Sequence, residues 1–128
     1  MFMHIKNIHT LFEELVPDEK TDVQLRTIID GETAFILAEL KPGKCLRAHY
    51  HHSGSEIYHV LEGSGEMEFG RWDGATVTWT ERCSLKAGDA FAVLPDVVHR
   101  LSNTHDERLR LVFLAPPAHL SDEDRFFV

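Results

Sequence analysis

The sequence predicts an all-β domain, a sandwich or a barrel, and three observations support this. Turn signals built on glycine, proline and aspartate recur along the chain, and the runs between them are about 6–9 residues long with many alternating patterns. Only one segment has apolar residues at helical spacing. The turn signals are Asp30-Gly31, Lys41-Pro42-Gly43, Ser53-Gly54, Gly63-Ser64-Gly65, Asp73-Gly74, Ala87-Gly88-Asp89, Pro95-Asp96 and His105-Asp106.

Alternation predicts which side of each strand faces the interior. In the run RLRLVFL, Leu109, Leu111 and Phe113 face one way, and Arg108 and Arg110 face the other. The run EMEF alternates in the same way. The residues expected to line the interior are Met67, Phe69, Phe91, Val93, Leu101, Leu109, Leu111 and Phe113. The run FGRWDGATVTWTER, which holds both tryptophans, predicts a hairpin that turns at Asp73-Gly74.

The segments that are not expected to form strands lie at the two ends of the chain. Residues 7–16 have Ile8, Leu11, Phe12 and Leu15 at helical spacing, which predicts one short helix that Pro17 ends. We treat residues 1–20 as an N-terminal extension. From residue 116 onward we expect a tail, or a short acidic helix packed outside the barrel. The length of 128 residues fits a single domain, 1–128.

Composition and charge indicate which partners and which cellular compartment to expect. The formal net charge is −8 and the acids are spread along the chain, which argues against binding to nucleic acid. Basic residues are not clustered, so an anionic membrane surface is a poor partner. No apolar run approaches the ~18 residues of a membrane span, and the N-terminus lacks the pattern of a secretory signal, so we expect a cytoplasmic protein. Cys45 and Cys83 fall in expected strands and are interpreted as buried thiols without a disulfide.

Histidines supply the candidate chemistry, since the chain has nine of them. His49 and His51 are two residues apart, so on a strand both project from one face. Glu56 opens the apolar strand EIYHVLEG with Tyr58 on its own face, and His99 opens the later run HRLSN. Three imidazoles and a carboxylate suit a divalent first-row metal. A single inward histidine is more often a hydrogen-bonded core residue, so the surrounding pattern has to decide.

That pattern resembles the cupin superfamily. From Gly43 to Gly63 the sequence GKCLRAHYHHSGSEIYHVLEG matches the first cupin motif at every fixed position. GDAFAVLPDVVHRLSN, from Gly88 to Asn103, resembles the second motif, with His99 in its expected register. The second segment departs from the family in two ways. Pro95 comes one position late, and the glycine expected after it is replaced in a shortened turn. The two motifs with their spacer cover residues 43–103.

The resemblance implies a double-stranded β-helix, the jelly-roll barrel of RmlC-like cupins, with a short helix at the N-terminus. It also implies one divalent metal ion, which could be Fe, Mn, Ni, Co or Zn, with coordination positions left open for a small-molecule substrate. Its ligands would be His49, His51, Glu56 and His99. Small cupins are commonly homodimers, and we expect the same here.

Three residues are candidates for catalysis: Glu56, Arg47 and Tyr58. Arg47 shares strand parity with His49, so it is expected to point inward and hold a substrate carboxylate or phosphate; an arginine paired at the rim is an equal alternative. Tyr58 could offer its hydroxyl to the pocket, although a packed barrel tyrosine is the favoured interpretation. Asn103 is interpreted as a structural hydrogen-bonding residue at a strand end.

The remaining histidines are not expected at the metal. His52 and His59 have the opposite strand parity, which predicts the outer face. The histidines near the ends or in turns are expected to be solvated: His4, His9, His105 and His119.

Several functions are compatible with this site. The leading hypothesis is a metal-dependent enzyme acting on a small organic molecule as a dioxygenase, decarboxylase, lyase or isomerase. The alternative is a non-catalytic module that binds a small molecule or sugar. A storage-like scaffold is disfavoured because the complete ligand set is retained. A metal-free sugar epimerase would rest on a His–Asp pair, and nothing in the sequence indicates one.

Overall fold

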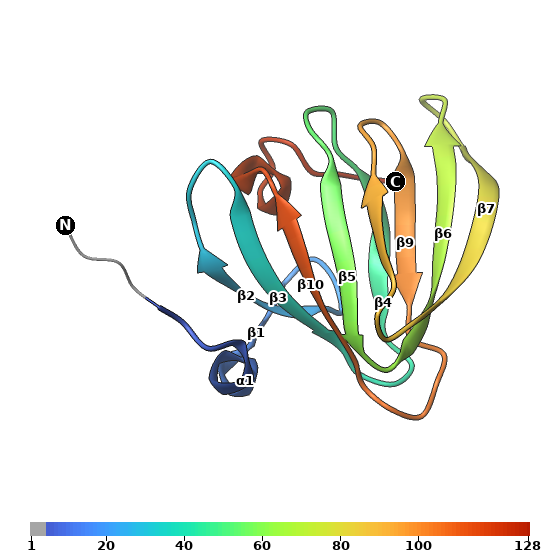
Figure 1. Ribbon diagram of the computed structural model, residues 1–128. Coiled ribbons are helices and arrows are strands. Elements are labelled where there is room, and N and C mark those ends of the chain that lie inside the picture. The colour runs from blue at the N-terminus through green and yellow to red at the C-terminus, as the bar shows by residue number, and fades with distance from the viewer. Residues whose placement is uncertain (1–4) are drawn as a thin grey trace.

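The computed structural model describes residues 5–128 and shows two facing β-sheets, with the one short helix outside them (Figure 1). The first sheet has six strands in the order β1-β2-β3-β10-β5-β8. These strands are β1 (Val16–Pro17), β2 (Gln24–Ile29), β3 (Ala34–Leu40), β10 (Leu109–Ala115), β5 (Glu56–Glu62) and β8 (Ala90–Val93). β10 lies between β3 and β5, and β8 pairs with β5, so the chain crosses between the two sheets as in a jelly roll. The all-β jelly-roll prediction is confirmed.

The second sheet has five strands in the order β11-β4-β9-β6-β7. They are β11 (Phe126–Phe127), β4 (Cys45–Tyr50), β9 (Val98–Ser102), β6 (Ser64–Trp72) and β7 (Val77–Lys86). β6 and β7 form the predicted hairpin around Asp73-Gly74. All the pairings in both sheets are antiparallel, and neither sheet closes on itself.

The main core fills the space between the sheets, and strand alternation places it there. In β10, Leu109, Leu111 and Phe113 are buried while Arg110 lies at the partly exposed face, as predicted. In β5, the residues Glu56, Tyr58 and Val60 are all buried, and those between them are exposed. Strict alternation therefore carries Glu56 into the interior beside apolar core residues.

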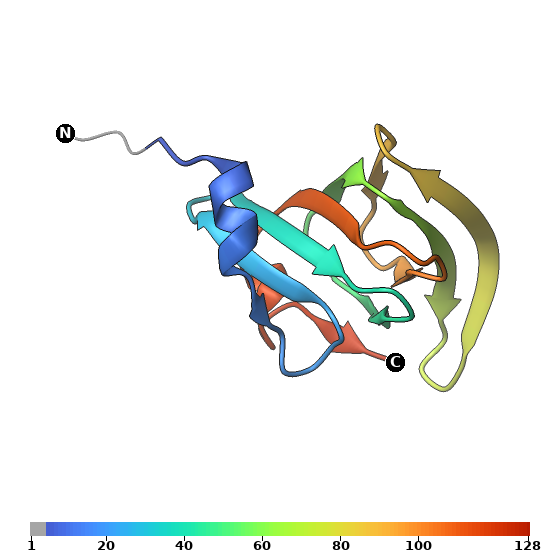
Figure 2. The same cartoon turned by 90° about the horizontal axis from the view of Figure 1, so that it is seen from below.

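The predicted helix forms but is shorter than residues 7–16. Its α-helical part, α1 (Ile8–Leu11), is followed by a 3-10 turn, η1 (Phe12–Glu14). The Asn7 side chain caps it by accepting hydrogen bonds from the backbone N–H groups of His9 and Thr10. Leu15 already has an extended backbone. The helix ends here because Val16 precedes a proline, which disfavours the helical conformation, and because Val16 and Pro17 form strand β1, which pairs with β2. The helix lies across the outer face of the first sheet, where Phe12 packs in a second core cluster (Figure 2).

The C-terminal segment, residues 116–128, differs from the prediction of an outside tail or acidic helix. A 3-10 helix, η2 (Pro117–Leu120), leads to β11, which pairs with β4 at the edge of the second sheet. Two polar residues of this segment, His119 and Asp124, are buried. The segment therefore covers one end of the interior, because the unpaired edge of β4 offers it a partner.

The two cysteines are free, as predicted, and lie on β4 and β7. Cys45 is half-buried, but Cys83 is exposed, so the prediction of burial is wrong for it. β7 is the edge strand of its sheet and is exposed along much of its length. Within residues 5–128, no helix is long and apolar enough to cross a membrane.

Candidate metal centre

The four predicted metal ligands come together in the interior between the sheets. His49 lies on β4 and His51 just beyond its end, Glu56 opens β5, and His99 lies on β9. One ligand atom from each residue can be chosen so that all four lie within 4.8 Å of one another. All four side chains are buried, with His99 fully inaccessible. The pairing of β4 with β9 places His49 opposite His99.

The three histidine rings are held in one orientation by backbone carbonyl groups. Nδ1 of His49 lies 2.6 Å from the carbonyl oxygen of Arg47, Nδ1 of His51 lies 2.5 Å from that of Asp124, and Nδ1 of His99 lies 3.0 Å from that of Val97. A carbonyl oxygen only accepts, so each Nδ1 carries the proton and donates it. In a neutral imidazole with the proton on Nδ1, Nε2 has its lone pair free, and this is the form that binds a metal.

This arrangement fits a divalent metal ion. Nε2 of His51 and Nε2 of His99 each lie 3.1 Å from the same oxygen, Oε1 of Glu56. If both rings are neutral with the proton on Nδ1, lone pairs of nitrogen face lone pairs of a carboxylate in a buried space. A cation among these atoms removes that conflict, and nitrogen with oxygen donors suits first-row metals.

Electrostatics keep the donors in their ligand forms. Burial, followed by the nearby His99, holds the pKa of His49 well below 6.5, so this ring stays neutral. Burial alone would raise the pKa of Glu56. The nearby rings of His119, His51 and His99 outweigh that effect and hold its pKa well below the usual range. Glu56 is therefore a carboxylate.

His119 was predicted to be solvated, and this prediction is wrong. The side chain is fully buried, and its ring is stacked on that of His51 with the centroids 3.9 Å apart and the planes 1° from parallel. Its Nδ1 lies 3.5 Å from Oε2 of Glu56, while Nε2 lies 2.5 Å from the carbonyl oxygen of Ser53. No sequence pattern indicated this, because the residue follows two prolines in a segment without periodicity.

Asp124 is a second residue that the sequence did not indicate. Its carboxylate accepts hydrogen bonds from the backbone N–H groups of His52 and Ser53, at 2.7 and 3.0 Å. Burial would raise the pKa of Asp124, but these two donors lower it. Its Oδ2 also lies 3.4 Å from Nε2 of His119, so the structure does contain a His–Asp pair. Because Nε2 of His119 is closer to the Ser53 carbonyl, that carbonyl is its main acceptor.

Arg47 does not point inward with His49, contrary to prediction. A register shift between Leu46 and His49 against β9 inserts an extra residue into β4, so the parity rule fails across it. Arg47 is exposed, and its guanidinium lies over the ring of Phe127, 4.6 Å from the centroid.

Tyr58 lies inside the barrel next to the ligands. It is buried, stacks on Phe91 and Phe113, and its hydroxyl donates a 3.4 Å hydrogen bond to Glu56. Burial, and then the Glu56 carboxylate, raise the pKa of Tyr58 well above its usual value, so it keeps its proton. Tyr58 is thus both a packed barrel residue and a hydrogen-bond donor to the site.

The other histidines follow the prediction where the structure describes them. His52 and His59 are on the outer face, and His9 and His105 are exposed. His4 lies outside the described residues. Asn103 is a structural residue, because its amide donates to the carbonyl oxygens of Leu40 and Glu107.

The shortened turn of the second motif keeps His99 in place through Asp96. This residue adopts φ 65°, the left-handed conformation that a glycine would take. Its backbone N–H donates to the carbonyl oxygen of His51 at 2.7 Å, and its carboxylate pairs with the exposed ring of His52. These two contacts join the turn to the loop after β4, which carries the candidate ligand His51.

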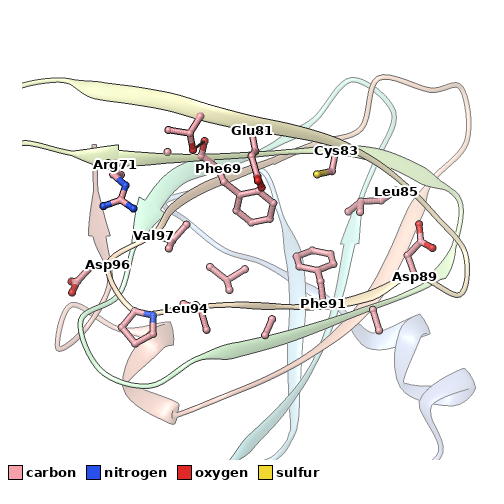
Figure 3. Close-up of a pocket in the computed structure, with 16 residues that line it drawn as sticks. Phe69, Arg71, Glu81, Cys83, Leu85, Asp89, Phe91, Leu94, Asp96 and Val97 are labelled. Carbon is pink, nitrogen blue, oxygen red and sulfur yellow. Dashed lines mark hydrogen bonds between the residues drawn. The ribbon is translucent and has the colours of Figure 1, made fainter.

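Two cavities lie near the ligands. A small one of about 20 Å³ is bordered by two of the ligands, His49 and Glu56. A cleft of about 750 Å³ opens between β7 and β8, where Phe69 and Phe91 point toward one another from opposite walls (Figure 3). None of the four ligands lines the cleft, although Phe69 pairs with His99 and Phe91 with Tyr58 across their strands. The ligands therefore lie one layer of side chains behind it.

The cupin domain model matches residues 36–115, more than half of the chain. The chain belongs to the cupin family. This cupin is 32% identical over 122 residues to the protein named polyketide synthase CurC of Streptomyces cyaneus, covering 88% of this chain and 73% of CurC. It is 28% identical over 123 residues to protein SchB of Streptomyces halstedii, covering 88% and 83%.

Solved structures support the same fold. A cupin 2 conserved barrel domain protein from Salinispora arenicola superposes with a TM-score of 0.68 at 21% identity, covering 95% of each chain. At this identity the likeness shows the fold alone. The buried cluster of three histidines and one glutamate fits the single metal site expected of a cupin.

Proposed function

We propose that this cupin is a metal-dependent enzyme that acts on a small oxygenated molecule of polyketide type, with carbonyl groups on alternate carbons. The observation that carries the proposal is the set of four buried candidate ligands, in which each histidine ring is oriented by a backbone carbonyl at Nδ1. A divalent metal ion held by these residues would polarise a substrate oxygen or, if the metal is iron, supply chemistry with dioxygen.

The residues around the ligands support the binding of a substrate oxygen through a hydrogen bond. Tyr58 keeps its phenolic proton and lies at hydrogen-bond distance from Glu56. We expect its hydroxyl to donate to a substrate oxygen placed beside Glu56. Glu56 serves as a ligand and orients the donors around it. Arg47, which is exposed, has no part in this proposal.

The substrate class rests on the curated relative and on the cleft. A protein 32% identical to this chain is named a polyketide synthase. The cleft between β7 and β8 has two phenylalanines and several aliphatic side chains on its walls, and its volume is in the usual range for small ligands. Phe91 of the cleft stacks on Tyr58 with centroids 5.2 Å apart. A flat, largely apolar molecule in the cleft would thus lie next to the residues of the site.

The test combines metal analysis with a simple β-diketone. The purified full chain, without a His-tag, is analysed for metal by mass spectrometry and then reconstituted with each candidate metal. The reaction followed is exchange of the central C–H protons of 2,4-pentanedione for deuterium in D₂O, by proton NMR. We expect the metal-loaded protein to accelerate this exchange above its spontaneous rate in D₂O, and we expect Glu56→Gln and His99→Ala to lose the acceleration. His59→Ala is the matched control, since that histidine is exposed on the outer face.

The outcomes of this test distinguish the classes of metal-dependent enzyme from one another and from a non-catalytic binding module. Iron with oxygen consumption would direct the assignment to a dioxygenase, and exchange with another metal would direct it to lyase, isomerase or decarboxylase chemistry. Failure to take up any metal on reconstitution would contradict the proposal. Metal binding together with a thermal shift by the β-diketone, but no acceleration of exchange and no product, would favour the alternative of a non-catalytic binding module.

We also propose that the protein is a cytoplasmic homodimer. Edge strands β7 and β8 leave unpaired backbone groups, and such edges favour pairing with a second chain. Light scattering coupled to size-exclusion chromatography tests this directly, and a monomer at micromolar concentration would overturn it.

A further inference from the structure

The small cavity beside the ligands has an unusual lining. It has a volume of about 20 Å³, and its lining includes apolar side chains as well as His49 and Glu56. The C-terminal segment contributes His119 and Arg125, and Asp18 comes from the loop before β2. A space of this size holds about one oxygen atom of a water or a ligand.

Two nitrogen atoms that belong to this lining have no hydrogen-bond partner. Within the described residues, the buried side-chain nitrogen and oxygen atoms that lack one are Nδ1 of His119 and Nε of Arg125. The Arg125 side chain is only 10% exposed, and its Nη1 is paired with Asp18 at 2.6 Å. A guanidinium N–H can only donate, so Nε of Arg125 is a buried donor without an acceptor. Such a group destabilises the fold unless an acceptor is supplied.

We infer that this cavity is a subsite for one oxygen of a small carboxylate-bearing ligand, with Arg125 donating to that oxygen from Nε. The inference rests on the proposed metal function, because the same oxygen would lie beside His49 and Glu56. Arginine is the side chain best suited to recognising a carboxylate in a buried place. Arg125 thus takes the position that strand parity suggested for Arg47.

The chain offers a matched control for this inference. The guanidinium groups of Arg47 and Arg125 both lie over the ring of Phe127, at 4.6 and 5.0 Å from its centroid. Arg47 is exposed and lines no part of the cavity, whereas Arg125 lines it. Arg47→Gln and Arg125→Gln therefore each remove one positive charge and one contact with the Phe127 ring. Only Arg125→Gln alters the lining of the cavity.

The experiment is a titration of the cobalt(II)-loaded full chain with acetate, followed by the visible absorption of the metal. Arg125→Gln should weaken acetate binding about ten-fold or more, as expected for loss of a hydrogen bond to a charged group. Arg47→Gln should leave acetate affinity unchanged. Asp18→Asn should strengthen acetate binding, because the guanidinium loses its competing carboxylate. Acetamide, which is uncharged and of similar size, should bind far more weakly than acetate.

The outcomes separate this inference from the function it rests on. A protein that takes up no cobalt(II) overturns the metal site itself. Cobalt(II) uptake with equal acetate affinity in the wild type and Arg125→Gln overturns only the subsite. If Arg125→Gln does not fold, Asp18→Asn decides: a purely structural role for the Asp18–Arg125 pair predicts weaker acetate binding, and the subsite predicts tighter binding.

Discussion

The ring of His119 lies flat against the ring of the metal-ligand candidate His51, with their centroids 3.9 Å apart. This contact joins the C-terminal segment to the ligand cluster. The same segment supplies the Asp124 carbonyl that orients His51 and the β11 strand that pairs with β4 at His49. The C-terminal residues are therefore part of the metal centre.

The first prediction concerns His119 as a positioning residue. His119→Phe keeps a stacked ring but removes the contact with Glu56, so metal affinity should fall about ten-fold, as for other groups that orient ligands. Competition with a chromophoric chelator measures this. His105→Phe, on an exposed turn, should keep wild-type affinity. Equal affinities in the two variants would remove His119 from the metal centre.

The second prediction concerns Asp124 as the acceptor that holds the ligand loop. Asp124→Asn leaves one of the two backbone N–H groups of His52 and Ser53 without an acceptor and the other with an uncharged one. We expect a loss of about 1–3 kcal/mol in the free energy of unfolding, measured by urea denaturation with metal removed. Asp122→Asn is the control, because Asp122 is mostly exposed and its pair with Lys20 contributes little. A loss in Asp122→Asn as large as that in Asp124→Asn would contradict this assignment.

The third prediction concerns the pH dependence of stability in the metal-free protein. The pKa of His49 is lowered below 6.5 in the folded state, so below about pH 6.5 the unfolded chain binds a proton that the folded one does not. The free energy of unfolding should therefore decrease as the pH falls below this value. Glu56, whose pKa is also lowered, stabilises the fold above its ordinary pKa of 4.5, and this contribution is lost as the pH falls through its folded pKa.

His119 acts in the opposite direction. Burial lowers its pKa, but the interactions with Glu56 and the Ser53 carbonyl raise it above 6.5 overall. Its contribution is full below 6.5 and is lost as the pH rises through the folded pKa. Urea denaturation with chelator, between about pH 7.5 and pH 5, should give a flatter profile for His49→Gln and a steeper one for His119→Phe. Parallel profiles in all three proteins would contradict both assignments.

The fourth prediction concerns two glycines with similar backbone conformations. Gly63 ends the first cupin motif at φ 87°, and a Cβ there would lie 2.3 Å from the carbonyl oxygen of Arg108. Gly74 has φ 99° in the hairpin turn, with open space around it. Gly63→Ala should cost more than about 2 kcal/mol beyond the cost of Gly74→Ala, since only Gly63 adds a backbone clash to the strain. Equal losses on thermal denaturation would show that the neighbouring strand gives way.

Local patterns were enough to predict the framework and the ligands. Alternation identified the buried face of β5 and β10, and turn residues marked the strand ends. Spacing within the two motifs indicated His49, His51, Glu56 and His99, which the structure brings together. These features depend on the two-residue period of a strand, which holds wherever the ladder is regular.

Tertiary structure decided what lies around those ligands. A bulge in β4 turned Arg47 outward, because one inserted residue reverses the faces of a strand and leaves no mark in the spacing. His119, Asp124 and Arg125 reached the site because residues 116–128 cover the end of the interior and pair with the free edge of β4. That contact joins residues far apart in sequence, and it is stabilised by burial and by strand pairing at an edge. Neither effect produces a periodic pattern in the local sequence, so the contact could not be predicted from it.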